Sequence, residues 1–209
     1  MIIYLNNIKP TYMSESEISD SDIYLKENIK LESNNNYLFK ANSGNGKSSI
    51  LNFIYKCNQN YNGSIIYDGI EYKNSIDIRN NYISYVFQDF KLFNNLSVWD
   101  NIKIKNNLTS HKTDNEISKL LKEIGLHEKK NSLIKELSIG QRQRTAIVRA
   151  LCQPFKFLLL DEPFSNLDED NISIITEMLN KELKNQKAGL IVTTLNNEYL
   201  FSYNKKFNL

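Results

Sequence analysis

The chain is poor in cysteine, has almost no excess of either charge, and contains no long hydrophobic run. Its 209 residues include only two cysteines, Cys57 and Cys152, too few for a disulfide framework or a cysteine-based metal cluster. Both lie in segments with helical patterns, so we expect buried thiols. Lysine and arginine total 26 against 24 aspartates and glutamates, a formal charge of +2 that excludes a strongly basic surface for nucleic acid or anionic membranes.

The sequence gives two indications of the cellular location of the protein. The longest apolar runs, such as Phe157–Leu160, are far too short to cross a bilayer. The opening Met1-Ile-Ile-Tyr-Leu lacks the basic start and long apolar stretch of a secretion signal. We therefore expect a cytoplasmic protein, and 24.4 kDa is enough for one domain with a real core.

Short β-branched runs alternate with helical patterns, which predicts an α/β fold with a mainly parallel sheet covered by helices. Expected strands are Ile2–Leu5, Tyr37–Phe39, Ser64–Tyr67, Tyr82–Phe87, Phe157–Leu160, Leu190–Thr193 and Lys206–Leu209. Expected helices, from apolar residues at three- and four-residue spacing, are Lys47–Tyr55, Val98–Ile104, Asn115–Ile124, Gln141–Leu151 and Ile172–Lys184.

No convincing strand appears between Gln88 and Pro154, which predicts a helical lobe inserted into the α/β core. We expect one domain over residues 1–209, with a core of 1–88 and 154–209 and a helical lobe of 89–153. The polar, acidic and serine-rich segment 14–22 predicts a solvated loop between two strands.

A glycine-containing loop near the start has the chemistry of a phosphate site. It reads Ala41-Asn-Ser-Gly-Asn-Gly-Lys-Ser-Ser49 and lies between an expected strand and an expected helix. Gly44 and Gly46 lack Cβ, so the backbone can wrap a phosphate chain with its N–H groups at the helix N-terminus. Lys47 supplies positive charge near the β- and γ-phosphates, and Ser48 supplies an oxygen ligand for Mg²⁺. The first position of the usual pattern is Ala41 instead of glycine, a penalty of about 1–2 kcal/mol if positive φ is required there.

An acidic pair supplies the other half of the predicted chemistry. Phe157–Leu160 has the continuous apolar character of a strand buried on both faces. Asp161 at its end can bind Mg²⁺ through water, and Glu162 can polarise an attacking water. The pair is weak evidence alone, but the segment 137–151 before it and Pro163-Phe-Ser-Asn-Leu-Asp168 after it strengthen the prediction.

With these segments together, the chain resembles the ATP-binding cassette of an ABC transporter over nearly its whole length. Leu137-Ser-Ile-Gly-Gln141 resembles the family's signature segment, which reaches the γ-phosphate bound by a second subunit. Val86-Phe-Gln-Asp-Phe-Lys-Leu-Phe93 resembles the Q-loop, and Ser165-Asn-Leu-Asp168 resembles the D-loop. The stretch 86–102 is most similar to cassettes paired with export, lipoprotein-releasing or cell-division permeases. In that subgroup Phe90, Leu92, Phe93 and Trp99 would help form the groove for a permease helix, although packing inside the lobe is an equal alternative.

The resemblance implies a P-loop NTPase core of the ABC type with an N-terminal antiparallel β portion, the cofactors ATP and Mg²⁺, and a set of site residues. The ATP-binding residues would be Tyr12, Asn42, Ser43, Gly44, Asn45, Gly46, Lys47, Ser48, Ser49, Ser138, Gly140 and Gln141. Glu162, Gln88 and Thr194 would be catalytic, and Ser48, Gln88 and Asp161 would bind the metal. Tyr12 would stack on adenine, with Tyr24 as the second candidate for that platform.

Three residues depart from the family pattern, all at the phosphate. Thr194 stands where the family's switch histidine is expected, Ile139 replaces a signature glycine, and Ala41 replaces the first glycine of the phosphate loop. The two histidines, His111 and His127, lie in the expected helical lobe and are predicted to be surface residues. These departures indicate slow turnover.

The leading hypothesis is the ATP-hydrolysing subunit of a transporter. It would act as a homodimer across ATP, bound to a separate transmembrane permease at the inner face of the membrane. One alternative is an ATP-gated regulatory module with little or no hydrolysis. A cassette that serves DNA repair or the ribosome is the weakest alternative, because the chain has no basic stripe for nucleic acid.

Overall fold

Two β-sheets form the frame of the molecule in the computed structural model, which describes residues 1–42, 44–195, 198–199 and 201–209. A three-stranded antiparallel sheet has the order β2-β1-β4, and a five-stranded parallel sheet has the order β5-β6-β7-β3-β8. The strands are β1 (Ile2–Pro10), β2 (Ile29–Glu32), β3 (Asn36–Lys40), β4 (Tyr61–Asp68), β5 (Ile83–Val86), β6 (Phe157–Asp161), β7 (Gly189–Thr194) and β8 (Lys205–Asn208). The predicted mainly parallel sheet is therefore confirmed, and the antiparallel portion is built from N-terminal strands.

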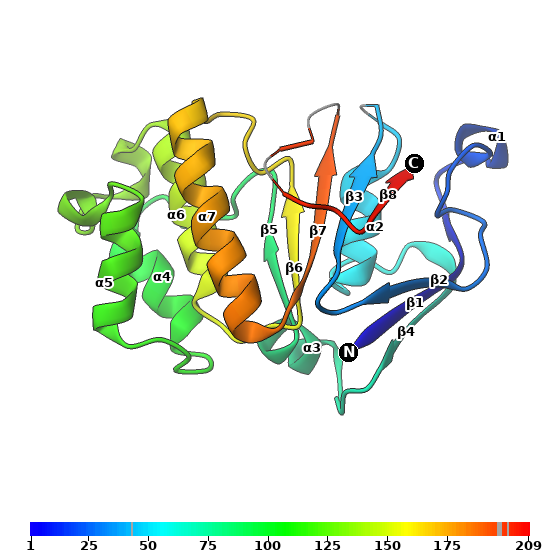
Figure 1. Ribbon diagram of the computed structural model, residues 1–209, viewed down its shortest axis with the longest axis horizontal. Helices are drawn as coiled ribbons and strands as arrows, with labels where there is room; N and C mark the ends of the chain where they lie inside the picture. Colours follow the sequence, from blue (N-terminus) through cyan, green and yellow to red (C-terminus); the bar gives the residue numbers. More distant parts are fainter. Residues whose placement is uncertain (43, 196–197, 200) are drawn as a thin grey trace.

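Helices cover the parallel sheet on both faces (Figure 1). They are α1 (Glu15–Ile18), α2 (Lys47–Ile54), α3 (Ser75–Asn81), α4 (Val98–Asn106), α5 (Asp114–Glu123), α6 (Ile139–Leu151) and α7 (Glu169–Gln186), with short 3₁₀ turns at His127–Lys129 and Ile134–Glu136. In Figure 1, α4, α5 and α6 gather at the left of the parallel sheet and the antiparallel sheet lies at its right.

Strand β6 shows how the sheet separates two hydrophobic clusters. Side chains alternate between the two faces of a strand, so Leu158 and Leu160 pack into the cluster shared with α4–α7. Phe157 and Leu159 point to the other face and join the cluster that contains α2 and the antiparallel sheet. All five residues of β6 are buried, as its continuous apolar run predicts.

Helix α2 packs between the two sheets, where it contacts β4, β6 and β7. Its buried face carries Ile50, Leu51, Phe53 and Ile54, which belong to the same cluster as Ile3 and Leu5 of the antiparallel strand β1. This packing fixes the N-terminus of α2 against the ends of the parallel strands, so the loop that precedes it has rigid supports on both sides.

Two local features of the fold differ from what the sequence predicts. Segment 14–22 was expected to be loop throughout, but Glu15–Ile18 forms a one-turn helix that buries Ile18. Helix α3 was not expected; it is short and buries only Ile78. Strand β2 begins after a turn in which Leu25 and Asn28 adopt positive φ.

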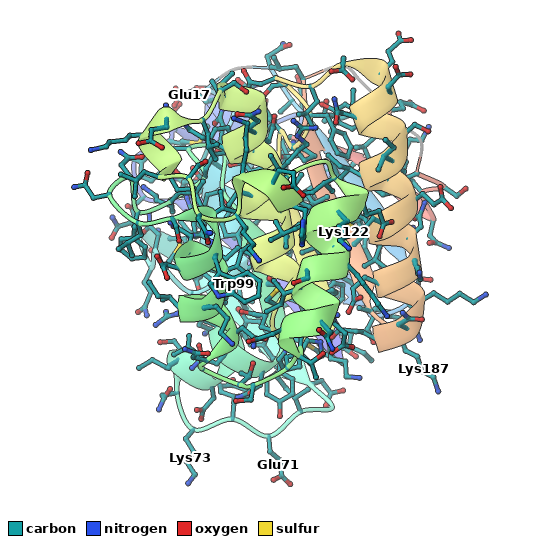
Figure 2. All side chains as sticks on the ribbon, turned by 90° about the vertical axis from the view of Figure 1, so that its left-hand side faces the viewer. Glu17, Glu71, Lys73, Trp99, Lys122 and Lys187 are labelled. Atoms are coloured by element: carbon teal, nitrogen blue, oxygen red, sulfur yellow. The ribbon has the colours of Figure 1, made fainter. Side chains whose placement is uncertain are left out.

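Residues 89–153 contain helices and turns, and within the described chain their β pairing is limited to one isolated bridge between Ser97 and Leu133. The helices of this lobe share one hydrophobic cluster with a face of the parallel sheet. The division into a core of 1–88 and 154–209 and a separate lobe stays a prediction. Figure 2 shows the outward face of the lobe, where Trp99 lies among the helices and Lys122 on α5.

Candidate functional site

The candidate site lies where parallel strands β3, β6 and β7 end. The strand pairing sets Lys40 beside Thr194 and Asp161 beside Thr193. Because carboxyl ends of parallel strands share one edge of the sheet, loops that follow these strands meet there. The phosphate loop, residues 41–46, follows β3 and leads directly into α2 at Lys47.

The backbone of the phosphate loop turns at its glycines. Gly44 and Gly46 have φ of 90° and 82°, in the left-handed region that favours glycine. Ala41 is not among the residues with positive φ, so the penalty considered for alanine at this position does not apply. The predicted site residue Ser43 lies outside the described residues.

Lys47 folds back over the phosphate loop. Its Nζ donates to the carbonyl oxygens of Ala41 at 2.9 Å and Asn42 at 3.0 Å. It also lies 3.5 Å from the Glu162 Oε1, and the two side chains are only 6% and 16% exposed. The structure therefore brings together the predicted cation of the loop and the predicted water-polarising carboxylate.

Glu162 directly follows β6 and has a φ of 47°, an uncommon backbone conformation for a residue with a side chain. Its N–H donates to the carbonyl oxygen of Thr193 on the neighbouring strand at 3.2 Å. Such left-handed residues often occur at functional sites, where the surrounding structure holds them. Here the backbone turn carries the chain out of the sheet immediately after Asp161.

Asp161 is buried and held by two hydroxyl groups. Thr193 Oγ1 donates to Asp161 Oδ1 at 2.6 Å, and the Tyr85 hydroxyl donates to Oδ2 at 3.3 Å. Burial, and next the nearby Asp161 charge, raise the pKa of Tyr85 well above its ordinary value. The Tyr85 hydroxyl therefore stays protonated and available as a donor. Sequence reasoning missed both supporting residues, since nothing in the strands β5 and β7 marks them apart from their neighbours.

The predicted metal ligands Ser48, Gln88 and Asp161 all line one open groove of about 1020 Å³. A hydroxyl, an amide oxygen and a carboxylate are the hard oxygen donors that suit Mg²⁺. Within the part of the chain that the structure describes, no group of three or more His, Cys, Asp or Glu side chains could hold a metal alone. The set fits a magnesium ion that takes its remaining ligands from phosphate and water.

The two candidate adenine platforms occupy different environments. Tyr12 lies in a turn after β1, is 57% exposed, and its hydroxyl donates to Ser49 Oγ in the first turn of α2. Tyr24 is completely buried, which excludes stacking on a base. Its hydroxyl donates to the Gly46 carbonyl oxygen at 2.7 Å, beneath the phosphate loop. The prediction of Tyr24 as second platform is therefore wrong.

The signature segment, residues 137–141, forms the start of α6. Ser138 is the N-cap, and its Oγ accepts from the Gln141 N–H at 3.3 Å. A Cβ on Gly140 would lie 2.9 Å from the carbonyl oxygen of Asn166, so glycine is needed for this approach to the D-loop. Ile139 is 56% exposed and points away from the core.

The signature segment is distant from the phosphate loop of the same chain. Helix α6 packs against β5 at the edge of the parallel sheet, whereas the loop follows β3, with β6 and β7 between the two strands. The structure thus does not bring Ser138, Gly140 and Gln141 together with Lys47.

Other predicted residues lie as follows. Gln88 is exposed in the segment after β5, and Thr194 ends β7 with 2% exposure. Arg149 of α6, not foreseen from the sequence, donates to the carbonyl oxygens of Phe90 at 2.6 Å and Lys91 at 2.7 Å. Both residues have positive φ, so Arg149 holds the strained turn that follows Gln88.

The cysteines differ from each other. Cys152, at the end of α6, is buried as predicted, and burial raises its pKa to about 12. Cys57 was expected in a helix and buried, but it lies beyond the end of α2 and is exposed on the groove. The helical pattern ends at Ile54 because Lys56 adopts positive φ and turns the chain away. The histidines are half-buried, His111 beside Glu182 and His127 beside Glu128. None of the described helices is long and apolar enough to cross a membrane.

Comparisons with known proteins agree with this geometry. Residues 26–165 match the ABC transporter family. The protein named HrtA in Staphylococcus epidermidis, an ATP-binding protein assigned to hemin import, is 30% identical over 97% of this chain and 93% of its own. LolD of Rickettsia bellii, the ATP-binding protein of a lipoprotein-releasing system, is 28% identical over 100% of this chain and 95% of its own.

Solved structures of similar fold include the ATP-binding cassette MJ0796, seen as a dimer in a post-hydrolysis state with ADP and Pi. It is 26% identical, with a TM-score of 0.75 over 94% of this chain and 88% of that one. A second dimeric structure of the same cassette is 27% identical, with a TM-score of 0.73 over 92% of this chain and 88% of that one. The chain therefore belongs to the ABC transporter family, as an ATP-binding cassette subunit of the kind that hydrolyses ATP.

Proposed function

We propose that this chain binds Mg-ATP between the phosphate loop and β6 and hydrolyses it to ADP and phosphate. The energy drives a separate transmembrane permease, to which the chain is bound at the inner face of the membrane. The observation that carries this proposal is the 3.5 Å approach of Lys47 Nζ to Glu162 Oε1 at the ends of the parallel strands. A phosphate cradle and a water-polarising carboxylate then share one site.

Binding uses the backbone of the loop and the helix after it. The N-terminus of α2, which begins at Lys47, points positive partial charge toward the phosphates, and the left-handed Gly44 and Gly46 set the curvature of the loop before it. Lys47 adds a full charge. Tyr12 offers an exposed ring beside Ser49 for the adenine base, and stacking on a base contributes about 1–3 kcal/mol.

Mg²⁺, when bound with the nucleotide, neutralises charge on the β- and γ-phosphates. Ser48 Oγ, the Gln88 side-chain oxygen and Asp161 are the groups that would hold it, and all three line the same groove. Thr193 and Tyr85 fix the Asp161 carboxylate through its two oxygens, so its orientation is set before any ligand arrives.

Glu162 has two successive partners in this proposal. Without nucleotide its carboxylate offsets the buried charge of Lys47. A γ-phosphate competes for Lys47 and leaves Glu162 to accept a proton from the attacking water. Thr194 ends β7 at the same edge of the sheet, where its hydroxyl would hydrogen-bond a phosphate oxygen but cannot supply imidazole. We therefore propose slow turnover.

The complete site needs a second copy of the chain. The start of α6 belongs to a different part of the molecule from the phosphate loop, yet it presents an N-capped helix end of the kind that favours anions. Ser138, Gly140 and Gln141 of one copy would meet the γ-phosphate held by the other. The dimeric cassette structures of similar fold support this arrangement.

The permease would bind beside Gln88. Phe93 is exposed, while Phe90, Leu92 and Trp99 are partly buried against the large cluster of the lobe. An export or lipoprotein-releasing type of permease fits the end-to-end likeness to a lipoprotein-releasing cassette. The packing of three of these side chains against the lobe leaves Phe93 as the one most available to a partner.

The test compares wild-type protein with the variants Glu162→Gln and Glu177→Gln. The second variant changes an exposed glutamate on α7 in the same chemical way and serves as the control. We expect Glu162→Gln to lower phosphate release at least 100-fold while Mg-ATP still binds, because general base catalysis contributes that much. Equal phosphate release by all three proteins, purified with the permease, would contradict the proposal and favour an ATP-gated module without hydrolysis.

A further inference from the structure

Tyr24 lies under the phosphate loop rather than beside the base. It follows the short helix α1 in the turn that leads to β2, and its side chain is completely buried. The hydroxyl donates to the carbonyl oxygen of Gly46 at 2.7 Å, across 22 positions of sequence. None of the roles derived so far uses this buried hydroxyl.

Gly46 is the residue whose peptide opens α2. It is the N-cap of the helix and has a φ of 82° and a ψ of 14°. Its carbonyl oxygen accepts two hydrogen bonds, one from the Ile50 N–H at 3.0 Å and one from Tyr24. A carbonyl oxygen has two lone pairs, so both bonds are satisfied together. The position of this oxygen is therefore fixed from the helix and from beneath the loop.

The geometry of the peptide bond transmits this constraint to Lys47. In a trans peptide the C=O and the following N–H lie in one plane and point in opposite directions, and the described chain contains no cis peptide bond. With the Gly46 oxygen held toward Tyr24, the Lys47 N–H points to the opposite side, away from the buried ring. That is the side on which a phosphate chain can lie against the loop.

The ring of Tyr24 also prevents the phosphate loop from moving toward the core. A Cβ placed on Gly46 would lie 2.6 Å from the Tyr24 Oη, 3.1 Å from Cε2 and 3.2 Å from Cζ. The aromatic ring thus lies in contact with the Gly46 backbone, and the glycine permits that close approach. The ring packs beneath the turn and supports the Gly46 backbone, and the hydroxyl sets the orientation of the Gly46–Lys47 peptide.

The turn that carries Tyr24, residues 21–24, is itself held by hydrogen bonds. Ser21 Oγ accepts from the N–H groups of Ile23 at 3.1 Å and Tyr24 at 2.8 Å. The Asp22 N–H donates to the Asn208 carbonyl oxygen at 2.8 Å, and Asp22 Oδ2 accepts from the Asn208 N–H at 2.7 Å. The turn is therefore tied to β8 at the far edge of the parallel sheet. Burial raises the pKa of Tyr24, so its hydroxyl stays a donor throughout the physiological pH range.

We propose that Tyr24 is a positioning residue for the phosphate loop: its hydroxyl holds the Gly46–Lys47 peptide so that the Lys47 N–H faces the nucleotide phosphates before they bind. This inference rests on the proposed function, since it assumes a nucleotide in the loop. Pre-organisation removes the cost of turning the peptide on binding, so it acts on affinity for any ligand whose phosphates occupy the loop.

The test is Tyr24→Phe, which removes the hydroxyl and keeps the ring. Tyr67→Phe is the matched control, because the Tyr67 hydroxyl is also buried and donates to a carbonyl oxygen of the same helix, Ile54 at its C-terminal end, at 2.6 Å. Each variant loses one hydroxyl-to-carbonyl hydrogen bond of α2. Titration with fluorescent Mg-ATP and Mg-ADP gives Kd, and thermal unfolding gives stability.

We expect both variants to lose similar thermal stability, and only Tyr24→Phe to raise Kd, by about three- to tenfold, the size of one net hydrogen bond. The rise should be the same for Mg-ATP and Mg-ADP, which share the phosphates of the loop. Hydrogen exchange without nucleotide should be faster in Tyr24→Phe alone at the Ile50 amide, which donates to the Gly46 carbonyl oxygen.

Two results would overturn the role of Tyr24. One is an unchanged Kd in Tyr24→Phe, and the other is an equal rise in both variants, which would mean general loosening of α2. A wild-type protein that binds neither nucleotide would instead reject the proposed function itself, so the two failures are distinguishable.

Discussion

At the residue scale, the site depends on charges held away from water. Lys47 and Glu162 offset each other in a buried pair, and removing one partner would leave the other charge uncompensated. Asp161 is buried as well, and two hydroxyl groups donate to it. Each charged group that the chemistry needs is therefore oriented by neighbours that belong to different strands or to the loop.

Another cation, the partly buried Lys105, forms no ion pair with any residue that the structure describes. Lys105 on α4 has its pKa lowered to about 8, first by burial and next by the nearby positive charges of Arg149 and Arg79. Burial likewise lowers the pKa of Arg149 to about 10. Arg79 lines the groove, and Arg149 holds the turn after Gln88. The desolvated charges of Lys105 and Arg149 cost stability in the isolated chain.

Lys105→Met tests that cost. The folded-state pKa of Lys105 is lower than the unfolded value, so between about pH 8 and 10.5 the unfolded chain binds more protons and stability rises with pH. At pH 7 the cost is fully present. We expect Lys105→Met to raise the free energy of unfolding at pH 7 by about 2 kcal/mol, after allowing for partial solvent exposure, and to add little at pH 10.5.

Urea unfolding at the two pH values measures both effects. Lys122→Met is the control, since Lys122 is an exposed lysine on α5 (Figure 2). An equal gain from both variants, or a gain from Lys105→Met that does not depend on pH, would show that the added apolar side chain rather than the lost charge stabilises the protein.

At the scale of elements, the sequence predicts the helices and strands that have long, regular apolar patterns. The strand at Phe157–Leu160 was predicted from its continuous apolar run, and the helix at Gln141–Leu151, which begins at Ile139 in the structure, from its regular apolar spacing. Helix α3 was not predicted because it buries only Ile78. The usable signal was its N-cap, Asn74, whose side chain accepts from the N–H groups of Ile76 and Asp77.

The candidate site likewise contains residues that the sequence predicts and residues that it does not. Lys47, Asp161 and Glu162 were identified because their chemistry follows from residue type and from position at the end of a strand. The supporting roles of Tyr24 and Tyr85 were missed because each hydroxyl contacts a residue far away in the sequence. The partner of Tyr24 is 22 positions away and that of Tyr85 is 76 positions away. A single sequence does not contain the side-chain directions that such contacts require.

The N-cap residues of α6 and α4 allow the stability of a helix to be separated from ATP hydrolysis. Ser138 Oγ accepts from the Gln141 N–H, and Ser97 Oγ accepts from the Asp100 N–H, so each serine caps one helix of the lobe. Ser138→Ala and Ser97→Ala should each lower the free energy of unfolding by about 0.5–2 kcal/mol. Only Ser138→Ala should also lower ATP hydrolysis, because in the proposed dimer the Ser138 hydroxyl would also contact the γ-phosphate bound by the other copy. Chemical unfolding and phosphate release of both variants check this, and equal activity would leave Ser138 a cap only.

At the scale of the whole molecule, the phosphate loop and the signature segment of one chain lie at different places along the parallel sheet. The phosphate loop follows β3, and the start of α6 is placed by β5 at the edge of the same sheet. A Cβ on Gly140 would lie 2.9 Å from the Asn166 carbonyl oxygen, so the signature segment and the D-loop of one chain are in close contact. Closure of two copies around ATP would therefore carry both segments of one copy onto the nucleotide of the other.

This arrangement predicts an ATP-dependent dimer that becomes stable when hydrolysis is blocked. We expect Glu162→Gln to have the mass of one 24.4 kDa chain without nucleotide and about twice that with Mg-ATP, measured by light scattering after size exclusion. Adding Ser138→Asp should abolish the dimer, because aspartate is a good N-cap residue but its carboxylate repels the γ-phosphate. Ser97→Asp, the same change at the N-cap of α4, should leave the dimer intact. A dimer that forms equally in all three proteins would show that the two copies meet through another surface.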